Sequence, residues 1–74
     1  MQRYAVSYVS FFDNELSTEI VEAEDKVEAL TKHSKIANVT EQREYFDSFI
    51  NLEDAKAGAF ESDCLVDVVE VPNE

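Results

Sequence analysis

The segment from Arg3 to Phe12 constrains the fold most, because it has no charged residue after Arg3 and is rich in β-branched and aromatic side chains. These residue types favour a β-strand. Alternate side chains of a strand point to opposite faces. Both sets are partly apolar here: Tyr4, Val6, Tyr8 and Phe12 form one, and Ala5, Ser7, Val9 and Phe11 form the other. We therefore expect this strand to lie at the centre of a sheet.

Two further strands are expected to accompany it. The polar stretch Asp13–Glu15 favours a turn, and the alternating residues 16–21 that follow it predict a β-hairpin. Glu19 and Glu22 on this second strand carry like charges, which is typical of a sheet edge. The β-rich segment Cys64–Val71 predicts a third strand, which ends at Pro72 because proline cannot donate to a ladder.

The residues between the second and third strands predict helices. Asp25 followed by Glu28 is the pattern of a helix start, and an apolar stripe follows: Val27, Leu30 and Ala37, flanked by Ala29 and His33. We expect this first helix to extend to Ala37, with Lys32 and Lys35 near its end.

Two more helices are expected after it. Thr40 is suited to cap a second helix, whose expected core residues are Tyr45, Phe46, Phe49 and Ile50. Asn51 is suited to cap a short third helix over Leu52–Phe60, whose expected inner residues are Leu52, Ala55, Ala59 and Phe60.

The element order is therefore β-β-α-α-(α)-β. It predicts an α+β fold with a three-stranded antiparallel sheet in the order 2-1-3 and two or three helices packed on one face. One Gly and one Pro in 74 residues leave no room for a flexible linker. We expect one domain over residues 1–74, with frayed residues 72–74.

Catalytic and metal-binding patterns are missing from the chain. His33 and Cys64 are its only histidine and cysteine, and a nucleophilic pair would need them in direct contact with a third, orienting group. We expect instead a partly exposed histidine at a helix end and a small buried cysteine. A metal site would need more ligands, and Gly58 alone cannot build a phosphate-binding loop. We predict no catalytic residue, no metal and no cofactor.

Charge limits the partners of this protein. Seventeen acidic residues against six basic ones give a net charge of −11. This charge opposes direct binding to nucleic acid or anionic lipid and favours a partner protein with a basic surface. No apolar run approaches the 18 or so residues of a membrane span. The single cysteine and the lack of a secretory signal pattern predict a cytoplasmic protein.

The acidic residues suggest a partner-binding surface. Rows of carboxylates can mimic a phosphate backbone and occupy the basic groove of a nucleic-acid-handling protein. The candidates for this role are Glu19, Glu22, Glu24, Glu41, Glu44 and Asp47. The alternative is that these residues form a solvated face that only improves solubility.

Two other functions compete with this hypothesis. The island of Lys32, His33 and Lys35 would suit a phosphate in an oligomeric nucleotide-binding protein. Asp67 is expected on the sheet face away from the helices, together with Leu65, Val69 and Val71. Such a face favours docking of a partner or a second copy, as in a structural or regulatory subunit, unless a loop or a dimer mate covers it.

The hairpin Arg3–Ala23 followed by the capped helix start Asp25–Leu30 resembles small bacteriophage-encoded proteins made early in infection, which often bind and inhibit a host enzyme. The resemblance covers the first half of the chain and is one of size, acidity and organisation. It implies a non-enzymatic inhibitor that acts in the host cytoplasm.

Overall fold

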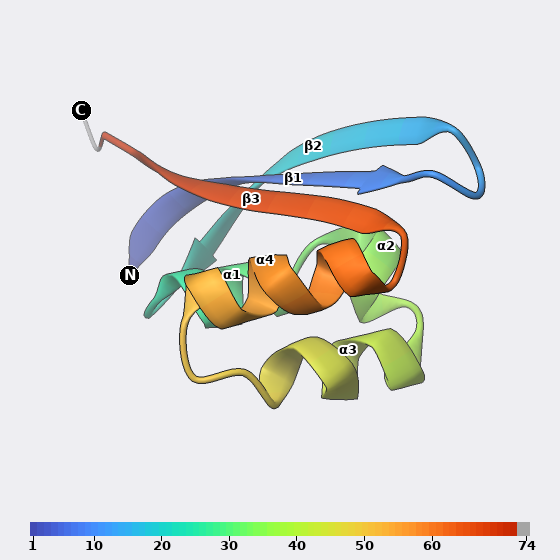
Figure 1. Ribbon diagram of the computed structural model, residues 1–74. Helices are drawn as coiled ribbons and strands as arrows, with labels where there is room; N and C mark the ends of the chain where they lie inside the picture. Colours follow the sequence, from blue (N-terminus) through green and yellow to red (C-terminus); the bar gives the residue numbers. More distant parts are fainter. Residues whose placement is uncertain (73–74) are drawn as a thin grey trace.

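The computed structural model describes residues 1–72 and contains one antiparallel sheet (Figure 1). Its strands are β1 (Gln2–Ser10), β2 (Glu15–Ala23) and β3 (Cys64–Val71), in the order β2-β1-β3. The predicted α+β fold and strand order are therefore confirmed, with β1 central and β2 at an edge. The expected fraying of the tail concerns residues 72–74, the last two of which lie outside the described residues.

Four helices cover one face of this sheet: α1 (Lys26–Thr31), α2 (Ser34–Ala37), α3 (Thr40–Asp47) and α4 (Leu52–Glu61). The core lies between these helices and the inner face of the sheet. Tyr4, Val6 and Tyr8 of β1 are buried there, together with Val66 and Val68 of β3. This arrangement follows from the two-residue periodicity of the strands, which sends every second side chain toward the helices.

The hairpin turn begins earlier than the sequence suggested. β1 ends at Ser10, and Phe11 and Phe12 lie exposed in the turn. The expected places of Phe12 on the face of Tyr4 and of Phe11 on the face of Ala5 were therefore wrong. The turn contains Asn14 in the left-handed region, at φ 52°. Asparagine tolerates this backbone conformation better than most residues.

The predicted first helix is two helices. It starts as expected, since an Oδ1 atom of Asp25 accepts a hydrogen bond from the Glu28 amide at 2.8 Å. It ends at Thr31, because His33 is extended (φ −61°, ψ 135°) and its Nδ1 atom caps α2 by accepting from the Lys35 amide at 3.2 Å. The expected place of Ala37 in the apolar stripe was wrong: Ala37 is exposed, and its neighbour Ile36, which the predicted stripe did not include, is buried.

Helix α3 packs against α1 and α2 and is the helix farthest from the sheet (Figure 1). Its N-cap residue is Val39, which makes no side-chain cap, so the prediction that Thr40 caps it was wrong. Only Phe46 of its four expected core residues is buried; Phe49 is partly buried, and Tyr45 and Ile50 are exposed. An outer helix buries a narrower stripe, because most of its contacts are with the neighbouring helices α1 and α2.

Helix α4 begins as predicted, with Asn51 Oδ1 accepting from the Asp54 amide at 2.9 Å. Ala55 and Ala59 are buried, but Phe60 is 66% exposed, against expectation. Gly58 is buried beneath two aromatic rings. A Cβ atom at this position would lie 2.5 Å from Cζ of Phe49 and 2.7 Å from the Tyr45 hydroxyl oxygen.

We predict that Gly58→Ala lowers the free energy of unfolding by about 1 kcal/mol, although this change in a helix interior normally stabilises by a similar amount. The added methyl group must displace the Phe49 and Tyr45 rings, and overpacking of this kind costs about 1–3 kcal/mol. Urea denaturation measures the difference. In a Phe49→Leu background the same change should cease to be destabilising. A stabilising Gly58→Ala in the wild-type background would contradict the close contact.

Candidate functional site

The face of the sheet that lies away from the helices is open, and we call it the open face (Figure 1). The strand register arranges its side chains in rows across β2, β1 and β3. Two rows are apolar, Leu16–Val9–Leu65 and Ile20–Ala5–Val69; a polar row, Thr18–Ser7–Asp67, lies between them, and the last row is Glu22–Arg3–Val71.

Large apolar side chains on the open face lie in solvent. Leu16 is 70% exposed, Ile20 60% and Val69 58%. The placement of Asp67 on this face with Leu65, Val69 and Val71 was predicted and is confirmed. Contiguous exposed apolar surface of this kind marks contact sites in proteins. The open face is therefore the first candidate site.

The polar row between the two apolar rows is internally satisfied. The hydroxyl groups of Ser7 and Thr18 lie 3.1 Å apart and share a hydrogen bond. Asp67 accepts from the Val68 amide at 2.9 Å, and Lys56 Nζ lies 3.6 Å from its carboxylate. These groups require no external partner, so the apolar rows dominate the chemistry of the face.

The six acidic residues predicted to bind a partner do not form one surface. Glu22 lies on the open face, 4.0 Å from Arg3 Nε, and Glu24 is exposed in the segment after β2. Glu41, Glu44 and Asp47 belong to α3, in the layer farthest from the sheet, and the sixth residue, Glu19, belongs to β2.

Glu19 has a structural role on the helix side of β2. Its carboxylate accepts hydrogen bonds from both the amide (3.0 Å) and the hydroxyl group of Ser34 at the start of α2. Donation by the Ser34 hydroxyl is the main reason why the pKa of Glu19 is lower than usual. Glu19 therefore ties the edge strand to the helical layer.

His33 is fully buried, so the expectation of a partly exposed histidine was wrong. Because Nδ1 accepts from the Lys35 amide, the proton lies on Nε2, which faces the Ser17 carbonyl oxygen at 3.3 Å. The sequence did not reveal this burial, because it depends on α2 folding back against β2.

The predicted basic island is not a free surface. His33 is buried, and the two lysines beside it are engaged. Lys35 Nζ lies 2.8 Å from Glu15, while Lys32 Nζ donates to the Glu22 carbonyl oxygen at 2.6 Å and lies 3.3 Å from Glu28. Carboxylates thus already balance the charges of both lysines, which disfavours this island as a phosphate site.

Cys64 is partly buried and contacts Tyr8, whose hydroxyl oxygen lies 3.6 Å from Sγ. Burial, together with the hydrogen bond to Cys64, raises the pKa of Tyr8 to about 12. Within residues 1–72 no hydrogen bond joins His33 and Cys64, so the two do not form the contact that a nucleophilic pair requires.

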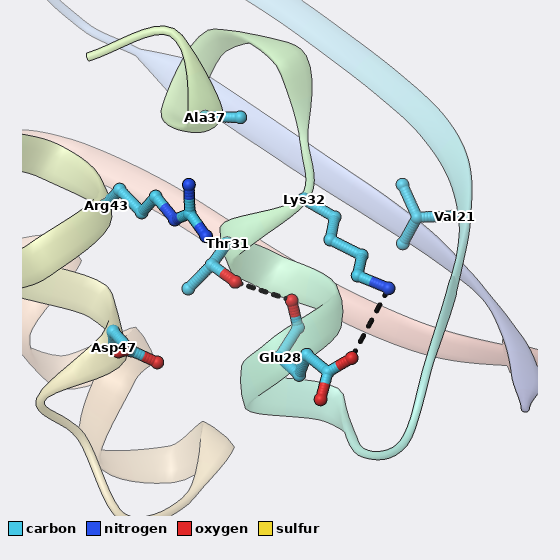
Figure 2. A pocket seen from close by; sticks show the side chains of 7 residues that line it. All are labelled: Val21, Glu28, Thr31, Lys32, Ala37, Arg43 and Asp47. Atoms are coloured by element: carbon cyan, nitrogen blue, oxygen red, sulfur yellow. Dashed lines mark hydrogen bonds and ion pairs between the residues drawn. The ribbon is translucent and has the colours of Figure 1, made fainter. Parts of the chain in front are cut away.

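A second candidate site is a cleft of 590 Å³ between β2 and helices α1–α3, which we call the α3 cleft (Figure 2). It is lined by Val21, Glu28, Thr31, Lys32, Ala37, Arg43 and Asp47. Two of the six basic residues of the chain meet here. No sequence pattern pointed to Arg43, because its place in one cleft with Lys32 depends on how α3 packs against α1.

The comparisons with known proteins identify no relative: no family model, no curated protein and no solved structure matches this chain. Within the described part of the chain, no helix is long and apolar enough to cross a membrane. Nor do three His, Cys, Asp or Glu side chains of that part gather in a way that would hold a metal ion. Any functional conclusion must therefore come from the geometry itself.

We predict that Glu19→Gln destabilises the protein by about 1 kcal/mol at pH 7, because it weakens the acceptor that caps the start of α2. The pKa of Glu19 is lower in the folded state than in the unfolded state. The ionised side chain therefore stabilises the fold at pH values above the unfolded-state pKa near 4.5, and this stabilisation is lost as the pH falls through the folded-state pKa. Urea denaturation from pH 7 to pH 3 should show the difference between wild type and variant shrinking. Glu24→Gln is the matched control and should change little. A deficit independent of pH would contradict this role.

Proposed function

We propose that this protein is a non-enzymatic binding module that docks, through the open face, onto an apolar patch surrounded by basic residues on a partner protein. The observation that carries the proposal is the exposure of Leu16, Ile20 and Val69 in two apolar rows. Apolar surface gains roughly 25 cal/mol for each Å² removed from water, so covering these rows favours association.

The open face is not needed to complete the protein's own core. Val6 and Val68 on the inner face are already almost fully buried beneath the helices. The outer apolar side chains therefore add little to folding and remain available to a partner. Because the inner face forms the core and the open face does not, the open face can dock a partner without loss of core packing.

Charge supports a basic partner over a second copy. A copy carries the same net charge of −11, so two open faces brought together would repel each other. Asp13 and Asp63 lie at the hairpin end of the sheet and make no ion pair with any residue up to Pro72. Glu22 lies at the other end of the open face, and Asp67 lies between the two apolar rows. An apolar centre with a charged rim is the usual anatomy of a protein interface.

This mode of binding suits an inhibitor, which is the function that the resemblance to early bacteriophage proteins implies. A compact acidic protein that covers the basic surface of a host enzyme blocks access to it. Mimicry of a phosphate backbone by rows of carboxylates has less support, since Glu22 lies on the open face and Glu44 on α3. In our proposal the acids attract the partner over a distance of about 8 Å at physiological salt.

The test compares two double variants in affinity capture from a bacterial lysate. Ile20→Asn with Val69→Asn makes one apolar row of the open face polar. Ile50→Asn with Phe60→Asn is the matched control, because these side chains are 90% and 66% exposed but lie among the helices. We expect the wild type and the control to retain a basic protein that the open-face variant binds at least about tenfold more weakly.

High salt should weaken this capture without abolishing it, because salt screens the charges but not the apolar contact. Circular dichroism checks that both variants fold. Equal capture by the open-face variant, an acidic partner, or no capture at either salt would each refute the proposal.

A further inference from the structure

The charges in the α3 cleft fall into two groups (Figure 2). Lys32 and Glu28, from α1 and its end, form an ion pair at 3.3 Å, and Lys32 also donates to the Glu22 carbonyl oxygen. Arg43 and Asp47 line the cleft from α3. Neither side chain makes an ion pair or a hydrogen bond with another residue between 1 and 72.

Arg43 and Asp47 are four residues apart on one helix and still do not pair. The order of the two charges explains this, because a basic residue placed before an acidic one is the weaker arrangement at this spacing. The four other basic residues that do pair, Arg3, Lys32, Lys35 and Lys56, each have a carboxylate beside them. Arg43 and Lys26 are thus the two basic residues without an ion pair in residues 1–72, and of the two only Arg43 lines the cleft.

These groups select a particular class of ligand. A guanidinium group binds a carboxylate or phosphate with two parallel hydrogen bonds, and Asp47 accepts from an ammonium group. The four charged residues of the cleft sum to zero and the whole chain carries −11, so a polyanion such as a nucleotide would be repelled. A zwitterion can pair with both Arg43 and Asp47, and because it has no net charge the chain does not repel it.

We infer that the α3 cleft binds a small zwitterion of the free amino acid class, with its carboxylate on Arg43 and its ammonium group on Asp47. Val21 and Ala37 provide apolar walls for the remainder of the molecule. The volume of 590 Å³ lies within the range of about 300–1,000 Å³ that small-molecule sites occupy. This site lies on the helix side of the sheet and does not depend on docking through the open face.

The test is an NMR titration of the folded protein with each standard amino acid in turn. The probes for comparison are inorganic phosphate, adenosine monophosphate and, for any amino acid that binds, the same carboxylic acid without its ammonium group. We expect at least one amino acid to give saturable shifts centred on Thr31, Lys32, Arg43 and Asp47. The comparison probes should bind at least about tenfold more weakly.

Variants locate the site. Arg43→Gln and Asp47→Asn should each weaken amino acid binding at least about tenfold, because each removes a charge-assisted hydrogen bond. Lys26→Gln is the matched control: Lys26 is the other basic residue without an ion pair in residues 1–72, and it lies outside the cleft. The Ile20→Asn, Val69→Asn variant should bind as the wild type does.

No saturable shift with any amino acid, equal or tighter binding of phosphate or adenosine monophosphate, or unchanged binding by Arg43→Gln would overturn the inference. These results leave the docking proposal intact, since it concerns the other side of the sheet.

Discussion

The rest of the structure depends on one constraint: the central strand β1 has two partly apolar faces, and the helices cover only one. Residues 26–61 form four short helices, which bury Val6 and Tyr8 on the inner face. No described segment covers the other face, where Ile20 and Val69 flank Ala5. The surface left in solvent therefore follows from the order of the elements, and it is the surface through which we propose that a partner docks.

A second constraint is the buried His33. Its extended backbone ends the first helix, and its two ring nitrogens join the start of α2 to the carbonyl oxygen of Ser17 in β2. Glu19 adds a further link between the same elements. Through these contacts α2 lies against the edge strand, and the α3 cleft remains between α1 and α3. His33, which was expected to be a partly exposed histidine at a helix end, is instead a buried structural residue between α2 and β2.

The two candidate sites differ in their chemistry and lie on different sides of the sheet. The open face offers apolar area, and in our proposal the net charge of −11 favours a basic partner for it. The α3 cleft is locally neutral and offers one unpaired cation and one unpaired anion, Arg43 and Asp47. A small ligand and a protein partner therefore have no need to compete for the same residues.

The sequence by itself determined the strands, their order and the starts of α1 and α4, because these depend on local patterns: the uncharged run after Arg3, and the side-chain caps Asp25 and Asn51. It also placed Asp67 on the outer face, since an unpaired carboxylate is costly in a core. Only the tertiary structure decided the break at His33, the exposure of Ile50 and Phe60, and the placement of Lys32 and Arg43 in one cleft. Each of these depends on which neighbouring element covers a residue, and short helices with few apolar positions do not encode that choice locally.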